Sequence, residues 1–177
     1  ARAVMGHWLG AAAAALALAR GLPAERAVLI APAADPLAAV ERFSRFVWLA
    51  GHLGRPMFAQ FEQAMRFEVD ELQAHVNAPR IGRPALIVHD LEDREVPWSE
   101  GERYARYWPQ ARLVSTRGLG HNRIVDDAST IAAALRFLHG EDVGERVVSS
   151  PTLPYGFAWG AAGLRKGRSQ MRSAMPL

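Results

Sequence analysis

The stretch ARAVMGHWLGAAAAALALAR, residues 1–20, decides how this chain folds. Its first part, Ala1–Gly6, is short and apolar, which is typical of a buried β-strand. Its second part, Leu9–Arg20, is rich in alanine, and Gly21 and Pro23 end it as they end a helix. A strand that leads directly into a helix indicates a sheet covered by helices.

The same apolar run also resembles a secretory signal peptide. Arg2 precedes it, and Ala17-Leu18-Ala19 resembles the small-residue site at which such peptides are cleaved. However, Gly6, His7 and Gly10 interrupt the run, which is also short for a membrane span. We therefore favour a buried strand and helix, and we expect a cytoplasmic protein without a membrane segment.

Three further apolar runs alternate with helical segments along the chain. They predict strands at Ala27–Ala31, Pro84–Val88 and Ala111–Thr116. Strands that alternate with helices predict an α/β fold, in which a mostly parallel sheet carries helices on both faces.

The chain is expected to consist of four parts in sequence. Residues 1–36 hold the first strand, its helix and the next strand. The aromatic-rich residues 37–80 form a helical cap insertion, and residues 81–140 complete the sheet. Residues 141–177 are expected to form a disordered tail, because their Gly, Pro, Ser and basic residues show no apolar period.

The composition argues against several classes of protein. The chain has 177 residues, a net charge of +3 and no cysteine. Disulfides and cysteine-based metal sites are therefore excluded, and we expect neither a metal nor a cofactor. The charge is modest and partly gathered at Arg165, Lys166 and Arg168, so we expect no nucleic-acid partner. The sequence does not indicate an oligomeric state.

Three short motifs follow the predicted strands in an order that points to chemistry. Gly6-His7-Trp8-Leu9-Gly10 follows the first strand and matches the nucleophile-elbow pattern G-x-S-x-G at every place except the central one. The segment His89–Pro97 follows the third strand and carries Asp93 three residues before Val96. Gly118-Leu119-Gly120-His121 follows the fourth strand. With these motifs in this order, the chain resembles the α/β-hydrolase superfamily.

The resemblance covers about Ala1–His139 and implies a partial α/β-hydrolase fold. It also implies a site that hydrolyses an ester, amide or similar bond of a small molecule. Asp93 would orient His121, which would act as general base and then as general acid. The backbone N–H of Leu9 would be an oxyanion donor, and His7 would be a structural neighbour in the elbow.

The elbow departs from the resemblance at its central residue, Trp8. Gly6 and Gly10 would give the strand and helix room to approach closely, while position 8 would carry the nucleophilic serine. An indole has no hydroxyl that could attack a carbonyl. A TCG serine codon needs one base change to encode tryptophan, so a point mutation or a sequence error is one explanation. The other serines near candidate loops lie on no elbow; they are Ser44, Ser99, Ser115 and Ser129.

Two other carboxylates compete with Asp93 for the role of the acid. Asp90 and Glu92 lie in the same loop, but neither stands three residues before Val96. Some histidines have no setting comparable with that of His121; they are His52, His75, His89 and His139.

Three functions remain open at this stage. The first is a hydrolase disabled by Trp8 and by the lack of an N-terminal part, since the chain opens inside a strand at Ala1. In the resembled family, the loop that supplies a second oxyanion donor precedes the elbow. The second is a non-catalytic binding or regulatory pseudoenzyme, in which Trp8 lines a closed pocket. The third uses Asp93 and His121 as a base without a covalent intermediate.

Deleting residues 149–177 should leave the melting temperature within about 2 °C of the parent value. The reason is that the segment lacks the apolar periodicity of a packed element. Differential scanning calorimetry of the two chains measures the difference. A drop of about 10 °C would show that the segment packs on the body.

Overall fold

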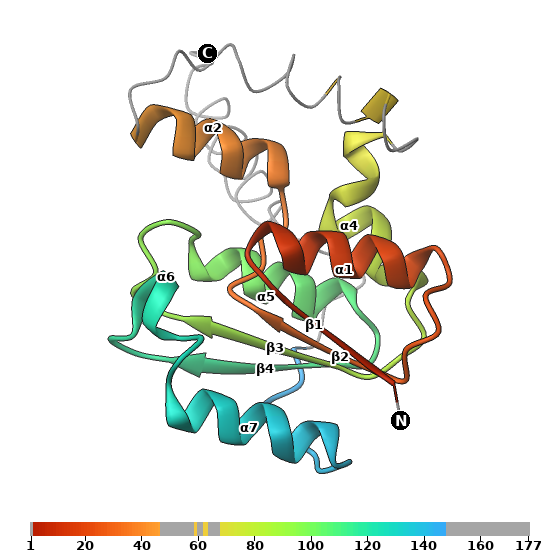
Figure 1. Ribbon diagram of the computed structural model, residues 1–177, viewed down its shortest axis with the longest axis vertical. Helices are drawn as coiled ribbons and strands as arrows, with labels where there is room; N and C mark the ends of the chain where they lie inside the picture. The colour runs from red at the N-terminus through yellow and green to blue at the C-terminus, as the bar shows by residue number, and fades with distance from the viewer. Residues whose placement is uncertain (1, 47–58, 60–61, 64–67, 148–177) are drawn as a thin grey trace, which may run out of the picture. The chain divides into compact units, whose positions relative to one another are not determined.

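The computed structural model describes residues 2–46, 59, 62–63 and 68–147. Within them, four parallel strands form one sheet in the order β1-β2-β3-β4 (Figure 1). The strands are β1 (Ala3–His7), β2 (Arg26–Ile30), β3 (Ala85–Asp90) and β4 (Ala111–Thr116). All four predicted strands are present, the last with the predicted bounds.

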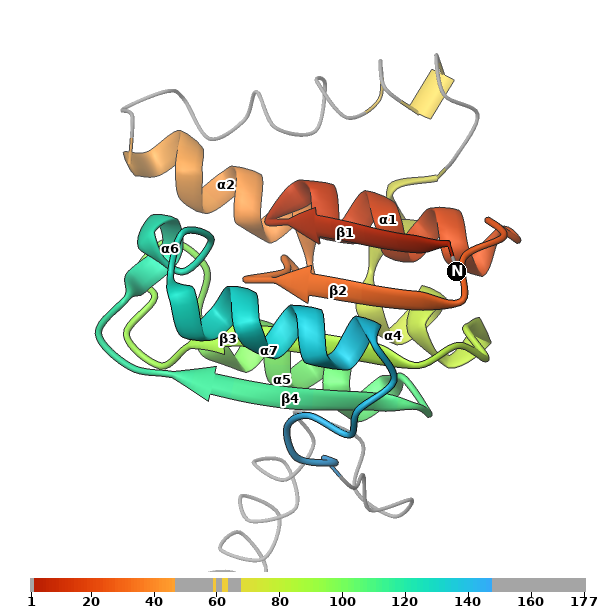
Figure 2. The same ribbon diagram turned by 60° about the horizontal axis from the view of Figure 1, so that its bottom comes forward.

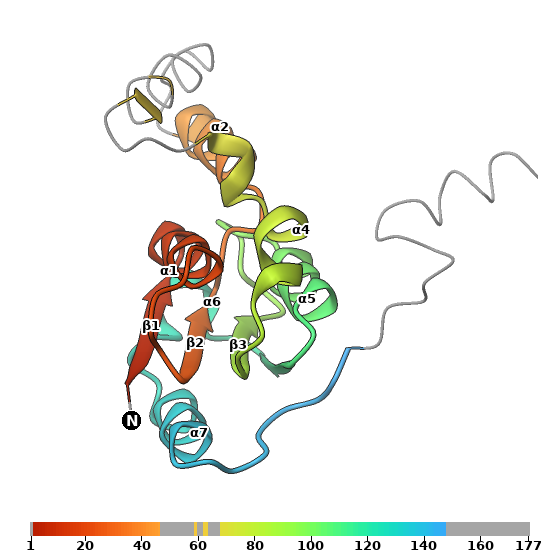
Figure 3. The same ribbon diagram turned by 90° about the vertical axis from the view of Figure 1, so that its right-hand side faces the viewer.

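Helices cover both faces of this sheet, as predicted. On one face lie α1 (Leu9–Ala19), α4 (Ala74–Asn77) and α5 (Trp98–Tyr107), and on the other lies α7 (Ala128–Leu138) (Figure 2, Figure 3). The remaining helical elements are α2 (Pro36–Phe46), η2 (Val69–Leu72), η3 (Ala78–Arg80) and α6 (Gly120–Arg123).

The central strands are apolar over most of their length because each of their faces meets a different core. Leu29 and Ile87 are buried in the core that α1 and α5 cover. Their neighbours in sequence, Val28 and Leu86, are buried in the core that contains Phe137 of α7. Since side chains alternate across a strand, a strand covered on both faces favours apolar residues at every position.

The first strand and helix approach most closely at Gly6. A Cβ built on Gly6 would lie 2.6 Å from the carbonyl oxygen of Gly10 and 2.7 Å from Cα of Ala11. A Cβ built on Gly10 would meet nothing within 4 Å. The prediction that both elbow glycines make room is therefore confirmed for Gly6 and wrong for Gly10, whose missing side chain would point into open space.

The segment predicted as a cap, residues 37–80, lies partly outside the described residues. At its start, the side chain of Asp35 accepts a hydrogen bond of 3.1 Å from the N–H of Ala38 and so caps α2. At its end, Ala74 and Ala78 are buried in the same core as α1 and α5. The last residues of the predicted insertion therefore pack as part of the main domain.

The chain just after α7 corrects the prediction that residues 141–177 form a disordered tail. The N–H of Leu113 in β4 donates to Glu145, and the N–H of Glu145 donates back, at 2.7 and 2.8 Å. Val143 is buried in the core beside α7. No apolar period reveals this attachment, because one bridge and one buried side chain suffice for it. Residues 148–177 lie outside the described residues.

Gly6→Ala should lower the free energy of unfolding by about 3 kcal/mol, because the new methyl group meets backbone atoms that cannot rotate away. Urea unfolding followed by circular dichroism measures this loss. Gly10→Ala is the matched control and should stay within about 1 kcal/mol of the parent, since its methyl group meets open space. Equal losses in the two variants would contradict the close approach at Gly6.

Candidate active site

Trp8 occupies the turn between β1 and α1 in a backbone conformation that few residues adopt. Its φ is 54° and its ψ is −122°. A positive φ in a residue other than glycine costs on the order of 1–3 kcal/mol and needs surrounding structure to hold it. Here the N–H of Trp8 donates to Ile30 and its carbonyl accepts from Ala11, both at 3.1 Å. This is the sharp strand-to-helix turn expected of a nucleophile elbow.

The first residue of α1, Leu9, follows this turn directly. The N–H groups in the first turn of a helix have no carbonyl partner within that helix. The Leu9 N–H therefore has the position expected of an oxyanion donor, and that role stays a prediction.

Residues 91–97, which follow β3 and are called the acid loop here, carry Asp93. Both carboxylate oxygens of Asp93 accept hydrogen bonds. Oδ1 accepts hydrogen bonds from the backbone N–H groups of Glu95 and Val96, at 2.9 and 2.8 Å. Oδ2 accepts from Nδ1 of His121 at 2.8 Å. The side chain of Asp93 has no exposed surface, so its carboxylate is fixed in direction.

Residues 117–121, which follow β4 and are called the histidine loop here, bring His121 to Asp93. Two glycines allow the backbone of this loop to change direction. Gly118 has a φ of 80° and Gly120 a φ of 67°, which lie in the left-handed region that favours glycine. His121 follows in α6 and is buried. The pairing of Asp93 with His121 that the resemblance implied is therefore confirmed. The Trp8 ring packs on His121, and the segments that carry the three residues follow β1, β3 and β4, whose carboxyl ends share one edge of the sheet (Figure 1).

Burial and hydrogen bonding act in opposite directions on Asp93. Burial alone would raise its pKa, because it penalises the charged form. Hydrogen bonds from the rings of His121 and His89 and from the Val96 N–H outweigh burial and hold the pKa of Asp93 well below its usual range. A carboxylate only accepts hydrogen bonds, so Nδ1 of His121 carries the proton and Nε2 is the acceptor in the neutral ring.

The two rival acids take other roles. Oδ2 of the buried Asp90 accepts from the Thr116 hydroxyl at 2.8 Å and from the Leu119 N–H at 3.1 Å, while Oδ1 accepts from the Glu92 N–H at 2.9 Å. Asp90 thereby ties the acid loop to the histidine loop. Burial opposes these hydrogen bonds, which nevertheless lower the pKa of Asp90. The Glu92 side chain is 56% exposed and lies 3.7 Å from Arg117.

Two elbow side chains pack against His121. Nε2 of His7 donates to the carbonyl oxygen of His121 at 3.1 Å, and the two ring centroids are 4.6 Å apart. Burial, and then the nearby His121, lower the pKa of His7. The Trp8 ring meets His121 edge-on at a centroid distance of 5.8 Å. Nε2 of His121 is buried and has no hydrogen-bond partner among the described residues.

His89 is the residue of this site that the sequence analysis missed. It is fully buried at the end of β3, and its Nε2 lies 3.4 Å from Oδ2 of Asp93. The sequence contained one signal of this role: two polar residues, His89 and Asp90, directly follow the apolar run of the third strand. The structure shows that all six residues of β3, including these two, are buried. Buried polar side chains need partners, and the following loop supplies them.

The other histidines lie elsewhere or outside the described residues. His75 is exposed and lies against Tyr107, with ring centroids 6.2 Å apart, and His139 is exposed at the end of α7. His52 lies outside the described residues.

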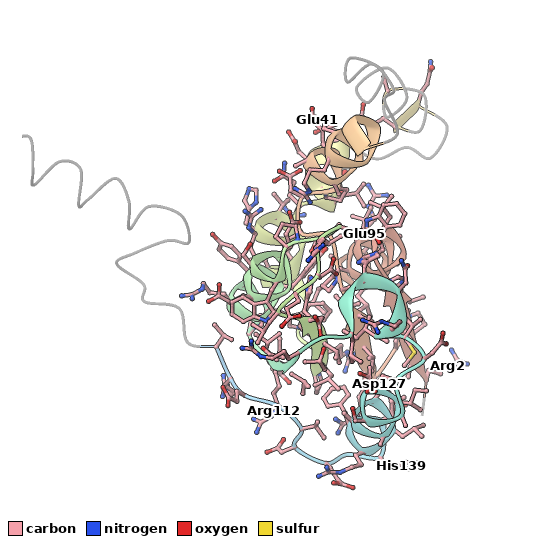
Figure 4. All side chains as sticks on the ribbon, turned by 90° about the vertical axis from the view of Figure 1, so that its left-hand side faces the viewer. Arg2, Glu41, Glu95, Arg112, Asp127 and His139 are labelled. Carbon is pink, nitrogen blue, oxygen red and sulfur yellow. The ribbon has the colours of Figure 1, made fainter. Side chains whose placement is uncertain are left out.

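A hollow of about 660 Å³ opens between the acid loop and the histidine loop. Its lining includes Asp93, Arg94, Gly118, His121 and Arg123. Figure 4 looks onto the edge at which the strands end. It shows Glu95 at this edge, whereas Asp127 and His139 lie along α7. The hollow therefore gives a small molecule room beside the Asp93–His121 pair.

The part of the chain that the structure describes contains neither a metal-binding cluster nor a membrane-spanning helix. No group of three or more His, Asp or Glu side chains is placed there to hold a metal ion. None of the helices in these residues combines the length and the apolar character needed to cross a bilayer.

Several solved structures share this fold at low sequence identity. A variant of the meta-cleavage product hydrolase CumD from Pseudomonas fluorescens matches with a TM-score of 0.55 and 19% identity, over 78% of this chain and 65% of that one. An α/β-hydrolase enzyme from the sediment metagenome of the Mar Chica lagoon matches with a TM-score of 0.54 and 17% identity, over 77% of this chain and 59% of that one. An esterase from Pyrococcus furiosus matches with a TM-score of 0.53 and 19% identity, over 77% and 52%.

No protein-family model matches the chain, and no curated protein matches it by sequence. The structural matches are to hydrolases, and they show that this chain has the α/β-hydrolase fold. The chain spans only 52–65% of the length of these three structures, so the fold is a partial one, as predicted.

Asp93→Asn should lower the free energy of unfolding at pH 7 by about 2 kcal/mol, because the amide cannot satisfy all the donors that surround the carboxylate. The folded pKa of Asp93 is depressed, so the carboxylate stabilises the fold above its unfolded pKa of about 3.9 and loses this effect as pH falls toward the folded pKa. The difference from the parent, measured by urea unfolding, should therefore shrink between about pH 5 and about pH 3.

Glu92→Gln is the matched control for this experiment. It removes a carboxylate from the same loop, but that side chain is 56% exposed, so its effect should be small at every pH. A stability difference for Asp93→Asn that stays constant from pH 7 to about pH 3 would contradict the depressed pKa.

Proposed function

We propose that this chain carries a serine-hydrolase-type site for an ester, amide or similar bond of a small molecule, with Trp8 in place of the nucleophile. The observation that carries the proposal is the hydrogen bond of 2.8 Å between Asp93 and His121, formed beside an elbow whose central residue has a φ of 54°. Both halves of the site lie where α/β sheets gather their ligands, at the carboxyl ends of the strands.

The retained groups have defined roles in such a reaction. With a serine at position 8, Nε2 of His121 would take the hydroxyl proton as the oxygen attacks the carbonyl carbon. Asp93 would hold the His121 ring and stabilise its positive charge. The N–H of Leu9 would donate to the oxygen that becomes negative. His121 would then return the proton to the leaving group, and a water molecule would release the acyl group by the same steps in reverse.

Trp8 blocks this sequence at its first step. Its indole offers no hydroxyl, and loss of the catalytic serine costs on the order of 10⁶ in turnover in the serine protease subtilisin. The ring also packs edge-on against His121, with the two ring centroids 5.8 Å apart. We infer that Trp8 occupies space that a substrate carbonyl would need.

A non-catalytic binding protein of the same fold is the second candidate. It is favoured by two observations: the ring of Trp8 packs on that of His121, and Nε2 of His121 is buried. A site that used Asp93 and His121 as a base on water would need this nitrogen to be accessible, so the third alternative requires Trp8 to move. On either candidate, we propose a small molecule as the ligand and the cytoplasm as the location.

Trp8→Ser should make the chain react slowly with a fluorophosphonate probe, because the introduced hydroxyl can displace fluoride from phosphorus while its proton passes to His121. The rate should be about 10²–10³-fold below that of an intact serine hydrolase, since the loop expected to supply a second oxyanion donor is not among residues 1–177. Intact mass spectrometry measures the gain of one probe per chain. Labelling is a better readout than ester turnover because it needs a nucleophile and a base but no later release step.

Two controls separate this reaction from unspecific labelling. Trp8→Ala opens the same space without a hydroxyl and should stay unlabelled. Trp8→Ser combined with His121→Ala should react at least about 10³-fold more slowly. If Trp8→Ser keeps the parent's circular dichroism spectrum and is labelled no faster than Trp8→Ala, the hydrolase proposal fails and the binding protein becomes the better account.

A further inference from the structure

His89 directs its donor nitrogen at the acid loop. Its Nε2 lies 2.9 Å from the carbonyl oxygen of Val96 and 3.4 Å from Oδ2 of Asp93. A backbone carbonyl can only accept a hydrogen bond, so Nε2 must carry the ring proton. The proton is therefore donated to the Val96 carbonyl at the end of the loop, and the nitrogen that carries it also lies beside the Asp93 carboxylate.

The position of the His89 ring is fixed by α5. A Cβ built on Gly101 would lie 2.4 Å from Nδ1 of His89 and 2.9 Å from its Cβ. The ring thus fills the space that a side chain at position 101 would take. Nδ1 is buried and has no hydrogen-bond partner among the described residues. An apolar side chain would fill this space without burying an unpaired nitrogen, which is unfavourable. Any advantage of histidine over an apolar side chain at position 89 must therefore come from the contacts of Nε2.

Together with the contacts of His89 Nε2, both oxygens of the Asp93 carboxylate are surrounded by hydrogen-bond donors. The N–H of Val96 donates to Oδ1 of Asp93 at 2.8 Å, while the carbonyl of Val96 accepts from His89. Oδ2 of Asp93 lies between two histidine rings, with His121 at 2.8 Å and His89 at 3.4 Å. Rotation of the carboxylate would break contacts on both sides.

We propose that His89 is a positioning residue of this site, which keeps Oδ2 of Asp93 in line with Nδ1 of His121. It acts through Asp93 and touches no substrate. The inference rests on the proposed function in one respect, namely that Asp93 and His121 form the acid–base pair of a hydrolase. Its physical content, the orientation of Asp93, can be measured in the chain with Trp8 in place.

Two substitutions separate donation by His89 from mere packing. His89→Gln keeps a donor nitrogen at about the reach of Nε2, while His89→Met fills similar volume without a donor. Nuclear magnetic resonance can follow the carboxyl carbon of Asp93 through an acid titration and the ring proton on Nδ1 of His121 through solvent exchange. In His89→Met, we expect a higher pKa for Asp93 than in the parent and at least about tenfold faster exchange of the His121 proton. His89→Gln should restore both toward the parent.

Two results would overturn the proposal. One is that His89→Met leaves the Asp93 pKa and the His121 proton exchange at their parent values. The other is that the glutamine and methionine variants change them equally, which would mean that only packing matters. If His89→Met does not fold, nuclear magnetic resonance of the ¹⁵N-labelled parent shows which ring nitrogen of His89 carries the proton. A proton on Nε2 supports the proposal, and a proton on Nδ1 contradicts it.

These readouts need no nucleophile at position 8. Failure of the fluorophosphonate experiment would therefore leave the positioning of Asp93 by His89 to be judged by itself, and failure of the His89 experiment would leave the hydrolase proposal standing.

Discussion

The approach of β1 to α1 at Gly6, where a single methyl group would meet backbone atoms at 2.6–2.8 Å, is the constraint on which this structure depends. It allows the chain to pass from strand to helix through one residue, and that residue, Trp8, is held at a φ of 54°. The alanine surface of α1 extends the same closeness along the helix, since Ala11, Ala12 and Ala15 are at most 1% exposed. The turn fixes position 8 at the carboxyl edge of the sheet, whatever side chain stands there.

The second determinant of the site is a pair of buried carboxylates, Asp93 and Asp90, which bind different parts of the histidine loop. Asp93 binds the ring of His121, and Asp90 binds the loop that carries this ring through Thr116 and Leu119. Charged groups are costly to bury unless hydrogen bonds compensate them, and each carboxylate has at least three donors. The two loops therefore hold each other in place, and the Asp93–His121 pair is formed in the absence of a nucleophile.

The sequence predicted the features that depend on local pattern. Strands appear as apolar runs, the elbow as two glycines at fixed spacing, and the acid and histidine as residues that follow strands whose carboxyl ends share one edge. The contact between Asp93 and His121, which 28 positions separate, was implied by the resemblance of the motif order to that of the α/β-hydrolase superfamily. Their catalytic roles stay predictions.

What the sequence did not reveal depends on contacts between distant segments. The role of His89 needs the acid loop to fold back over its ring and needs Gly101 of another element to make room. The open space beside Gly10 and the bridge between Glu145 and Leu113 are likewise set by neighbours far along the chain. None of these leaves a periodic signal.

We infer that Trp8, the residue that we propose stands in the nucleophile's position, covers the buried Nε2 of His121. The most direct measurement is carbethoxylation of histidines by diethyl pyrocarbonate, mapped by mass spectrometry in the parent and in Trp8→Ala. The exposed His75 and His139 serve as internal references in both chains. In the parent, we expect His121 to stay unmodified while His75 and His139 react. In Trp8→Ala, we expect His121 to react readily. Rapid modification of His121 in the folded parent, at the rate seen in Trp8→Ala, would contradict this inference.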